Sequence, residues 1–383
     1  MPATPGTLDK ISGQSRTMKK VILVNCLLVL TGLFLLELFF GSWFSQTPPL
    51  YRFIKPKNVH KTYVSSFAGQ PANTTYTIDK YGFRGLDKAL DEIFIVTVGG
   101  STTDQKYIDD KFTYEAWLQR FFEAEGRNVD IVSAGIDGQS TYGHLKNFPY
   151  WFEKLPQFRP RYILYYVGVN DFYILRELPG FDAMEKRGFK AALHNTQSYL
   201  KENSALYAAG TVIASLVSPP DVAHFRSDKP PAWSTGNWTT QSYVRTFRTP
   251  KVQESLLQLK VRISELAERT RTLGATPIFV AQRSVNWIEH EGKIWGRKGP
   301  LTRRHADALA DMRKLSGVDY YWLERMQASA IMEACHASSG ICIDLAGAMK
   351  LDHVAHFYDA VHTTPAGSKR IAEFLYPKLR DLR

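Results

Sequence analysis

The chain has 383 residues, of which 44% are hydrophobic and 13% aromatic, enough to bury the core of one large domain or two ordinary ones. It carries 48 Lys and Arg against 37 Asp and Glu, a formal net charge of +11. Such a charge suits an anionic partner, but the basic residues are dispersed and no nucleic-acid recognition motif accompanies them. We therefore expect no nucleic-acid binding, and we interpret the charge as a solvated surface that faces an anionic membrane or polymer.

The amino-terminal residues predict a membrane anchor. Residues 1–18 are polar and rich in Gly, Ser, Thr and Pro, a composition typical of a disordered tail. Residues 19–44 are a basic pair followed by a mostly apolar run that spans roughly 36 Å as a helix, enough to cross a bilayer. The run lacks the Ala-x-Ala-like site of a cleaved signal peptide, which favours an uncleaved anchor. Trp43 and Phe44 at its far end are typical of a membrane interface.

Charges beside this anchor predict its orientation. The two flanks carry similar numbers of basic residues, but Lys19 and Lys20 directly abut the apolar run. Positive charges next to a membrane helix favour the cytoplasmic side. We therefore expect a single-pass protein with a cytoplasmic amino end, and with everything after about residue 45 in the periplasm or another extracytoplasmic space.

Residues 45–90 predict an extended linker and edge structure. Their prolines break helices, and residues 76–85 have the composition of a short strand and a turn. We expect this segment to dock against the edge of a main domain that occupies residues 91–383.

That main domain alternates predicted strands and helices. The expected strands are 93–98, 129–133, 162–167, 277–281 and 340–345, and the expected helices are 113–125, 142–154, 252–272, 303–314 and 323–334. Such βαβ alternation predicts an α/β fold with a parallel sheet and helices on both faces. Residues 172–250 interrupt the rhythm with one helical stretch, 196–215, and a proline-rich loop, which we interpret as an insertion that could act as a lid.

Ser101 follows the first strand of this domain. The run 93–98 is short, rich in β-branched residues and stopped by Gly99 and Gly100, which is typical of a buried parallel strand and a tight turn. Ligands of open α/β sheets bind at the carboxyl ends of the strands. This position suits a nucleophile, although the segment by itself favours the more ordinary interpretation, a serine in a polar strand-to-helix turn.

A histidine and an aspartate lie on one loop near the end of the chain. Thr364 can cap a helix that has Pro365 at its first position, so Asp359 and His362 belong to the loop before that helix. A base three residues after a carboxylate can be aimed at a serine across the sheet edge. Acyl transfer needs these three groups, because the histidine takes the hydroxyl proton and the carboxylate fixes its tautomer.

Three groups at the same predicted edge are candidate oxyanion donors. They are the backbone amides of Ser101 and Gly138 and the side-chain amide of Asn170, which follow the first, second and third strands. Glycine allows close approach of the backbone to a ligand. Each such donor typically contributes about 3 to 4 kcal/mol to the transition state.

These segments resemble the four conserved blocks of the SGNH hydrolases, also called GDSL esterases and lipases, over residues 91–177 and 252–380. The matching blocks are Gly99-Gly-Ser101-Thr, the Gly138 turn, Gly168-Val-Asn170-Asp171 and Asp359-Ala-Val-His362. The resemblance implies a flavodoxin-like three-layer α/β/α sandwich with no metal or organic cofactor. It implies Ser101 as nucleophile, Gly138 and Asn170 as oxyanion donors, Asp359 as orienting group and His362 as base. The chain departs from the family pattern at Gly100, where an aspartate is usual.

Two other classes of function compete with this interpretation. The side chains of Asp352, His353, His356, Asp359 and His362 are suitable zinc ligands, but their spacing lacks a usual zinc motif. A carbohydrate-binding module on an inactive hydrolase fold is the second alternative, and Gly100 is its only direct support.

Within the enzyme hypothesis, the sequence favours acyl esters on a carbohydrate of the cell envelope. The anchor holds the site near the membrane, and the resemblance extends to relatives that act on acyl groups of envelope polysaccharides. Four tryptophans are candidate platforms for sugar rings, although core packing is expected for at least half of them: Trp233, Trp238, Trp287 and Trp295. We expect an O-acetyl esterase, with an O-acyltransferase that uses the same triad as the closest alternative and lipid esters as the third.

Cysteines and sequons add two conditional expectations. Cys335 and Cys342 lie outside the cytoplasm in this scheme, so either a disulfide or two buried thiols is expected. Asn73 and Asn237 begin sequons, which matter only in an organism that glycosylates them. The sequence does not indicate an oligomeric state.

Overall fold

A computed structural model describes residues 6–41, 43, 55, 57–85, 89–172, 204–207, 209–210, 213, 233–244, 246–299 and 315–383. The chain divides into two compact units. Residues 1–49 and 187–219 form one unit, and residues 50–186 and 220–383 form the other. The second unit contains all of the sequence-predicted site residues.

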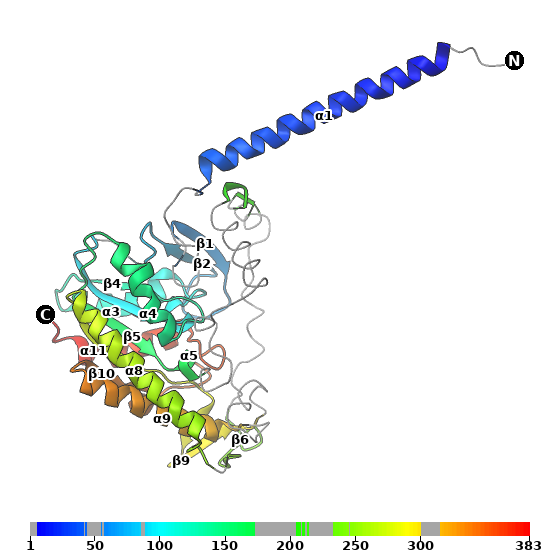
Figure 1. Cartoon of the computed structure of the whole chain (residues 1–383). Helices are drawn as coiled ribbons and strands as arrows, with labels where there is room; N and C mark the ends of the chain where they lie inside the picture. Colours follow the sequence, from blue (N-terminus) through cyan, green and yellow to red (C-terminus); the bar gives the residue numbers. More distant parts are fainter. Residues whose placement is uncertain are drawn as a thin grey trace. The chain divides into compact units, whose positions relative to one another are not determined.

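A five-stranded parallel sheet is the centre of the second unit (Figure 1). Its strands are β3 (Ile93–Gly99), β4 (Asp130–Ser133), β5 (Tyr162–Val167), β7 (Thr276–Ala281) and β10 (Ile341–Asp344). The spatial order is β10-β7-β5-β3-β4, and every neighbouring pair is parallel. Numbered along the chain, this is the 2-1-3-4-5 order of flavodoxin-like folds. The predicted α/β fold class is therefore confirmed.

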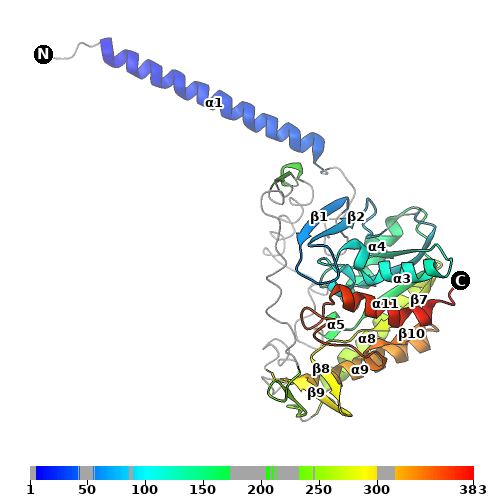
Figure 2. The same cartoon turned by 180° about the vertical axis from the view of Figure 1, so that it is seen from behind.

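Helices cover both faces of this sheet, as the two opposite views show (Figures 1 and 2). One face packs against α4 (Thr141–Tyr150), α8 (Pro250–Thr272) and α9 (Gly317–Ala337), and the other against α3 (Tyr114–Ala124) and α11 (Pro365–Leu379). Shorter helices are α2 (Ser101–Asp104), η1 (Asp110–Phe112), η2 (Phe152–Lys154), α5 (Val169–Phe172) and α10 (Leu345–Ala348). Buried aliphatic and aromatic side chains fill both helix–sheet layers, which fixes the strand ends that carry the site.

Two helices differ from their sequence predictions for local reasons. The helix expected at 323–334 begins six residues earlier, because Ser316 and Asp319 form a capping box that satisfies the first amides of α9. The helix expected at 142–154 ends at Tyr150 and continues as the separate turn η2, after Pro149 near its carboxyl end. The expected helices 303–314 and, for the most part, 196–215 lie outside the described residues, as does most of the 172–250 insertion.

Residues before the first core strand form a hairpin that belongs to the second unit. Strands β1 (Val59–Val64) and β2 (Asn73–Ile78) pair antiparallel over their full length. The following turn reaches the sheet at its edge, where Arg84 bridges Ser133 of β4. This segment therefore contacts the edge of the central sheet, and the boundaries expected for it remain predictions.

A second small sheet was not predicted. Strands β6 (Trp238–Thr239), β8 (Trp287–His290) and β9 (Lys293–Arg297) form it, in the order β6-β9-β8. Its hairpin turns at Glu291 and Gly292, both with positive φ. Strands β8 and β9 are short and separated by only two residues, so the sequence pattern of each is too brief to indicate a strand.

The amino-terminal helix α1 (Gly6–Phe40) contains the one described segment that is long and apolar enough to cross a membrane, Met18–Phe40. The tail expected to be disordered is helical from Gly6, because a helix once nucleated extends at little cost per residue. The helix ends at Phe40, four residues before the predicted boundary, and Gly41 follows it. Glycine is the commonest residue just beyond a helix end.

Glu37 has defined partners inside this first unit. Its carboxylate accepts hydrogen bonds from the Trp43 indole at 3.2 Å and from the amides of Ala205 and Leu206 at 3.0 and 3.1 Å. The Ser204 hydroxyl donates to the same carboxylate. These donors offset the cost of a carboxylate near the end of an apolar helix.

Cys335 and Cys342 form a disulfide. The bridge ties the last turns of α9 to the start of β10, across a separation of seven residues. Of the two outcomes that the sequence left open, the structure has the bridge. Disulfides persist in oxidising compartments, and the extracytoplasmic location of this unit stays a prediction.

Candidate active site

The structure brings Ser101, His362 and Asp359 into one hydrogen-bonded line. His362 Nε2 lies 2.7 Å from Ser101 Oγ, and His362 Nδ1 lies 2.6 Å from Asp359 Oδ2. The other oxygen of Asp359 accepts the amides of Val361 and His362 at 2.9 and 2.7 Å, which fixes the carboxylate. The line can carry a proton from the hydroxyl to the imidazole while the carboxylate holds the second ring nitrogen.

Partial burial and neighbouring charges tune both titrating groups. Burial alone would lower the pKa of His362, but the hydrogen bond and charge of Asp359, with the charges of Asp137 and Asp104, outweigh it and raise that pKa. Burial raises the pKa of Asp359, but the hydrogen bond and charge of His362 and two backbone amides outweigh it and lower that pKa. A quarter of the His362 side chain remains accessible, so a substrate can reach the ring.

Strand ends explain why these groups meet. Ser101 begins α2 directly after β3, and the 135–140 turn and Asn170 follow β4 and β5. The chain reverses its order in the sheet between β3 and β5, and ligands of such sheets bind at this switch point. His362 arrives on the loop before α11, whose cap Thr364 accepts the Gly367 amide as predicted.

Candidate oxyanion donors surround the same point. The Asn170 side-chain amide donates to the Gln139 carbonyl at 2.8 Å, which orients the group and leaves its second N–H for a ligand. Gly138 has φ of 73°, a conformation that favours glycine. The Ser101 amide lies in the first turn of α2, where amides have no partner within the helix.

Gly100 is required by the position of Asn170. A Cβ atom at residue 100 would lie 2.0 Å from Asn170 Nδ2 and 2.9 Å from the Gln139 carbonyl oxygen. Neither atom can stay in place beside any side chain at this position. The departure from the family pattern therefore leaves room for the amide of Asn170, and does not by itself argue for an inactive site.

Gln282 joins the serine turn to the asparagine turn, and sequence reasoning missed it. Its Nε2 donates to the Thr102 hydroxyl at 2.6 Å, and its Oε1 accepts the Val169 amide at 2.9 Å. Thr102 and Val169 are the chain neighbours of Ser101 and Asn170. The signal was available, because Gln282 is the first residue after the fourth predicted strand, at the edge where the other site residues lie.

A second buried network joins the serine turn to the histidine loop. Gln105 ends α2 in the left-handed conformation, and its Oε1 accepts the Ser368 hydroxyl at 2.7 Å. The Ser368 hydroxyl in turn lies 2.9 Å from the hydroxyl of Thr363, the residue after His362.

Asp171 holds the turn after β4 in a similar way. Its carboxylate accepts hydrogen bonds from the amide and the hydroxyl of Thr141 at 3.2 and 2.5 Å.

The residues of the zinc alternative are dispersed over separate contacts. His356 Nδ1 accepts the Asp352 amide, His353 packs edge-on against Trp238, and His362 is bonded to Asp359. Over the part of the chain that the structure describes, no three His, Cys, Asp or Glu side chains form a group that could hold a metal ion.

Two of the four candidate tryptophans are core residues, and two are accessible to solvent in part. Trp238 and Trp287 are buried, as expected for core residues. Trp233 and Trp295 are half-buried, and Trp233 packs on both Trp295 and His290 with ring centroids 4.9 and 4.1 Å away.

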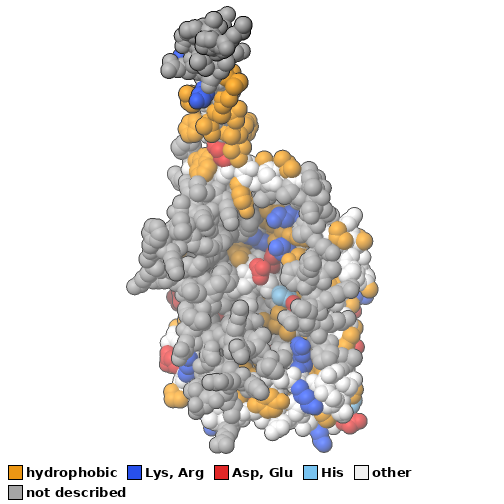
Figure 3. Space-filling view, turned by 90° about the vertical axis from the view of Figure 1, so that its right-hand side faces the viewer, with side chains coloured by type: hydrophobic (Ala, Val, Ile, Leu, Met, Phe, Trp, Pro, Cys, Tyr) orange, Lys and Arg blue, Asp and Glu red, His pale blue; other side chains and the backbone are white. Residues whose placement is uncertain are grey.

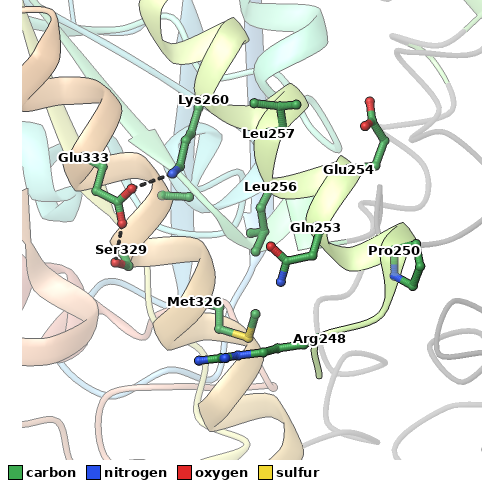
Figure 4. A pocket seen from close by; sticks show the side chains of 11 residues that line it. Arg248, Pro250, Gln253, Glu254, Leu256, Leu257, Lys260, Met326, Ser329 and Glu333 are labelled. Atoms are coloured by element: carbon green, nitrogen blue, oxygen red, sulfur yellow. Dashed lines mark hydrogen bonds and ion pairs between the residues drawn. The ribbon is translucent and has the colours of Figure 1, made fainter. Parts of the chain in front are cut away.

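A pocket elsewhere on the unit is distinct from this centre. It has a volume of about 770 Å³ between α8 and α9, and its walls include Leu256, Lys260, Met326 and Glu333 (Figure 4). None of the residues around Ser101 contributes to it. It therefore gives no information about the chemistry of the serine.

Comparison with known proteins identifies the family. The sequence profile described as GDSL-like Lipase/Acylhydrolase matches residues 95–375, most of the chain. The chain belongs to this family. It is therefore an ester-hydrolysing enzyme, as the sequence blocks predicted. A comparison with curated proteins gives no match.

Solved structures of other proteins also match this one. TesA has 13% identity, with 76% of this chain and 99% of that chain covered and a TM-score of 0.37. A GDSL-like lipase from Bacteroides thetaiotaomicron VPI-5482 has 12% identity, coverages of 78% and 93%, and a TM-score of 0.38. The acetyl xylan esterase AlAXEase has 11% identity, coverages of 74% and 98%, and a TM-score of 0.38.

Proposed function

We propose that this GDSL-like acylhydrolase is a membrane-anchored serine esterase that removes O-acetyl groups from a carbohydrate of the cell envelope. Ser101 is the nucleophile, His362 the base and Asp359 the orienting carboxylate. The observation that carries the proposal is the continuous line from Ser101 Oγ through both ring nitrogens to Asp359 Oδ2, with separations of 2.7 and 2.6 Å. Both separations lie within the range of good hydrogen bonds.

The reaction follows from this geometry. Ser101 Oγ attacks the ester carbonyl while His362 Nε2 takes its proton, and Asp359 stabilises the imidazolium that forms. Collapse of the tetrahedral intermediate releases the sugar alcohol, which receives that proton, and leaves an acetyl-serine. Water, deprotonated by His362, then attacks the acetyl-serine, so that acetate leaves and Ser101 regains its proton.

The oxyanion of each intermediate needs donors. The amides of Ser101 and Gly138 and the side chain of Asn170 are the proposed set. The Gln139 carbonyl holds the Asn170 amide in place before substrate binds, so reorientation during the reaction is small.

Support for an acetyl group and a sugar comes from the surroundings of His362. The charge of Asp137 reaches its ring, and Tyr358 stacks on it at 5.5 Å between centroids. A long alkyl chain beside a carboxylate would have to desolvate that charge, whereas an acetyl group need not. The half-buried ring of Trp295 belongs to β9 of the small sheet, and the ring of Trp233 packs against it. Val285, two residues before β8, donates to the Ala360 carbonyl in the His362 loop. These indole faces suit the apolar face of a sugar.

Membrane anchoring rests on α1 alone. Its segment Met18–Phe40 is exposed and apolar along its length. Residues 41–54 are a short connection, since a fully extended chain of that length reaches only about 50 Å. The proposal therefore keeps the esterase close to the membrane surface, with the amino end in the cytoplasm.

Hydrolysis of p-nitrophenyl esters of increasing chain length by the full chain in detergent tests the proposal. We expect activity on acetate and little on octanoate, and a loss of at least about 10³-fold in kcat for Ser101→Ala and for His362→Ala. Equal activity on long chains would contradict the acetyl assignment. Acetyl transfer to sugars without release of acetate would instead indicate an O-acyltransferase.

A further inference from the structure

The β1–β2 hairpin is fastened to the serine turn. The Tyr76 hydroxyl of β2 donates to Asp104, the last residue of α2, at 2.8 Å. The amide of Thr75 donates to Asp109 at 2.8 Å, and Gln70 bonds both the Tyr107 carbonyl and the Asp109 amide. The hairpin is thus held by the segment that directly follows the nucleophile.

Its tip also reaches the catalytic histidine through two aromatic rings. Phe67, in the β1–β2 connection, stacks on Tyr358 with centroids 4.8 Å apart and an interplanar angle of 20°. Tyr358 stacks on His362 at 5.5 Å and 8°. Phe67 and Tyr358 are only partly buried, so this wall of the site is open to a ligand.

Two lysines extend the same wall. Lys106 Nζ lies 5.9 Å from the Tyr63 ring centre and 5.6 Å from the Tyr107 ring centre. Lys61 is two residues before Tyr63 on β1, so both side chains leave the strand on the same face. Phe67 and Tyr107 pack against the cluster that contains Tyr63, which makes the lysines and the His362 stack parts of one surface.

No carboxylate neutralises either lysine in an ion pair within the described residues. The Tyr63 side chain lies on the same face of β1 as Lys61, and its ring is the one that Lys106 faces, so both ammonium groups belong to the Tyr63 side of the hairpin. Burial and the charge of Lys106 lower the pKa of Lys61, and the charge of Asp104 opposes them. The buried acid Asp104 is already paired with Lys55 at 2.7 Å. The negative charge of Asp137 raises the pKa of both Tyr107 and His362. A bound anion would therefore be favoured beside the lysines and repelled nearer to Ser101.

One face of the molecule combines these side-chain types. In Figure 3, Lys and Arg side chains lie near acidic side chains and a histidine, in a hollowed part of the face. Paired cations beside aromatic rings are a general arrangement for binding an anionic ligand that also has an apolar face.

We propose that the hairpin completes the substrate site, and that Lys61 and Lys106 bind a carboxylate of a polyanionic acetylated glycan. This inference rests on the proposed esterase function and narrows its substrate to acidic polysaccharides. The two lysines act on binding, so the effect belongs to KM.

The test compares two acetylated polymers with the full chain in detergent. Wild-type protein should have a higher kcat/KM on acetylated polygalacturonate than on acetylated xylan, which is neutral, and added salt should reduce the difference. In Lys61→Ala/Lys106→Ala the ratio of the two values should fall about 10-fold, through KM on the anionic polymer. Lys61→Arg/Lys106→Arg should restore most of the ratio.

Lys80→Ala is the matched control. Lys80 is exposed and also lies over a tyrosine ring, 4.9 Å from the centre of Tyr81, but Tyr81 is not part of the stack of Phe67 and Tyr358 on His362. Its ratio should equal that of the wild type. An unchanged ratio in the double variant overturns the inference. If the double variant keeps the ratio but no longer binds phosphatidylglycerol vesicles, the lysines contact the membrane and not the substrate, which also overturns the inference. Absence of p-nitrophenyl acetate hydrolysis in the wild type would instead contradict the esterase function itself.

Discussion

Asp359 determines at which pH its histidine can act as a base. Its hydrogen bond and charge raise the pKa of His362 against the opposing effect of burial. Only the neutral imidazole can accept the serine proton, so kcat/KM should rise with pH through a midpoint above about 6.5, the ordinary value for histidine.

Asp359→Asn should both weaken catalysis and move this profile. Without the carboxylate, burial remains and lowers the pKa of His362, so the rising limb should shift to lower pH. The loss of orientation should lower kcat by about 10³- to 10⁴-fold. Asp352→Asn is the control, because Asp352 also accepts two backbone amides of this region but does not bond His362. A profile that keeps its midpoint in Asp359→Asn would show that another group titrates.

Gly100→Ala tests the placement of the oxyanion donor. The added Cβ would displace the Asn170 amide, whose nitrogen lies 2.0 Å from its position. We expect kcat to fall by about 10²- to 10³-fold, as for loss of one oxyanion donor, while the protein remains folded. Gly236→Ala, where the nearest atom is 3.8 Å away, should have no effect. Full activity of Gly100→Ala would mean that Asn170 is not needed where the structure has it.

At this scale the sequence predicts the proposed catalytic residues better than the residues that hold them in place. Ser101, Gly138, Asn170, Asp359 and His362 stand at strand ends or before a cap, where position along the chain implies position in space. The role of Gly100 depends on Asn170, which is distant in sequence, so no local pattern indicates it. Gln282 also stands at a strand end, but its partners Thr102 and Val169 are distant in sequence, so its position indicates the site and not its contacts.

At the scale of the elements, the end of β7 stabilises two turns of the site in addition to forming part of the sheet. Gln282 at its end bonds the turns that carry Ser101 and Asn170. Gln282→Met keeps the length of the side chain and removes both bonds, which leaves the Val169 amide and the Thr102 hydroxyl without this partner.

We expect Gln282→Met to lower kcat by roughly 10-fold with little change in KM, and to cost about 1 to 3 kcal/mol of unfolding free energy. Steady-state kinetics and urea unfolding measure the two effects separately. Gln258→Met is the control, because Gln258 is exposed and bonds only Glu254. A variant that loses stability but keeps kcat would reduce Gln282 to a structural role.

Element prediction succeeded where the hydrophobic pattern repeats and failed where it is short. All five core strands were expected, because each is a buried apolar run that ends in a turn. Strands β8 and β9 are four and five residues long and alternate in burial only weakly, so pairing across their turn, not local pattern, makes them strands.

At the scale of the whole molecule, removal of the disulfide tests how much this bridge stabilises the fold. Cys335 is fully buried, and its bridge to Cys342 closes a short loop between α9 and β10. Replacing both cysteines by alanine should lower the free energy of unfolding by about 2 to 3 kcal/mol, in the chain-entropy estimate for a loop of this length. Urea unfolding without reductant measures the loss, with Cys26→Ala as the control. An unchanged midpoint would mean that the thiols are not joined in the protein.

The layered fold, the family and the position of an apolar helix were all predictable, since they follow from strand order, blocks at strand ends and a long apolar run. The boundaries assigned to the tail, linker and main domain remain predictions. The hairpin shows what such boundaries miss, because β1 and β2 lie before residue 91 but share a compact unit with the site.

Covalent labelling tests the central claim, that Ser101 is activated by His362, most directly. The full chain is treated with a fluorophosphonate, which phosphonylates activated serines, and the modified peptide is identified by mass spectrometry. We expect one phosphonate on Ser101 in the wild type, much slower labelling in His362→Ala, and no labelled peptide in Ser101→Ala. Ester hydrolysis that survives in Ser101→Ala, with labelling of a different serine, would contradict it.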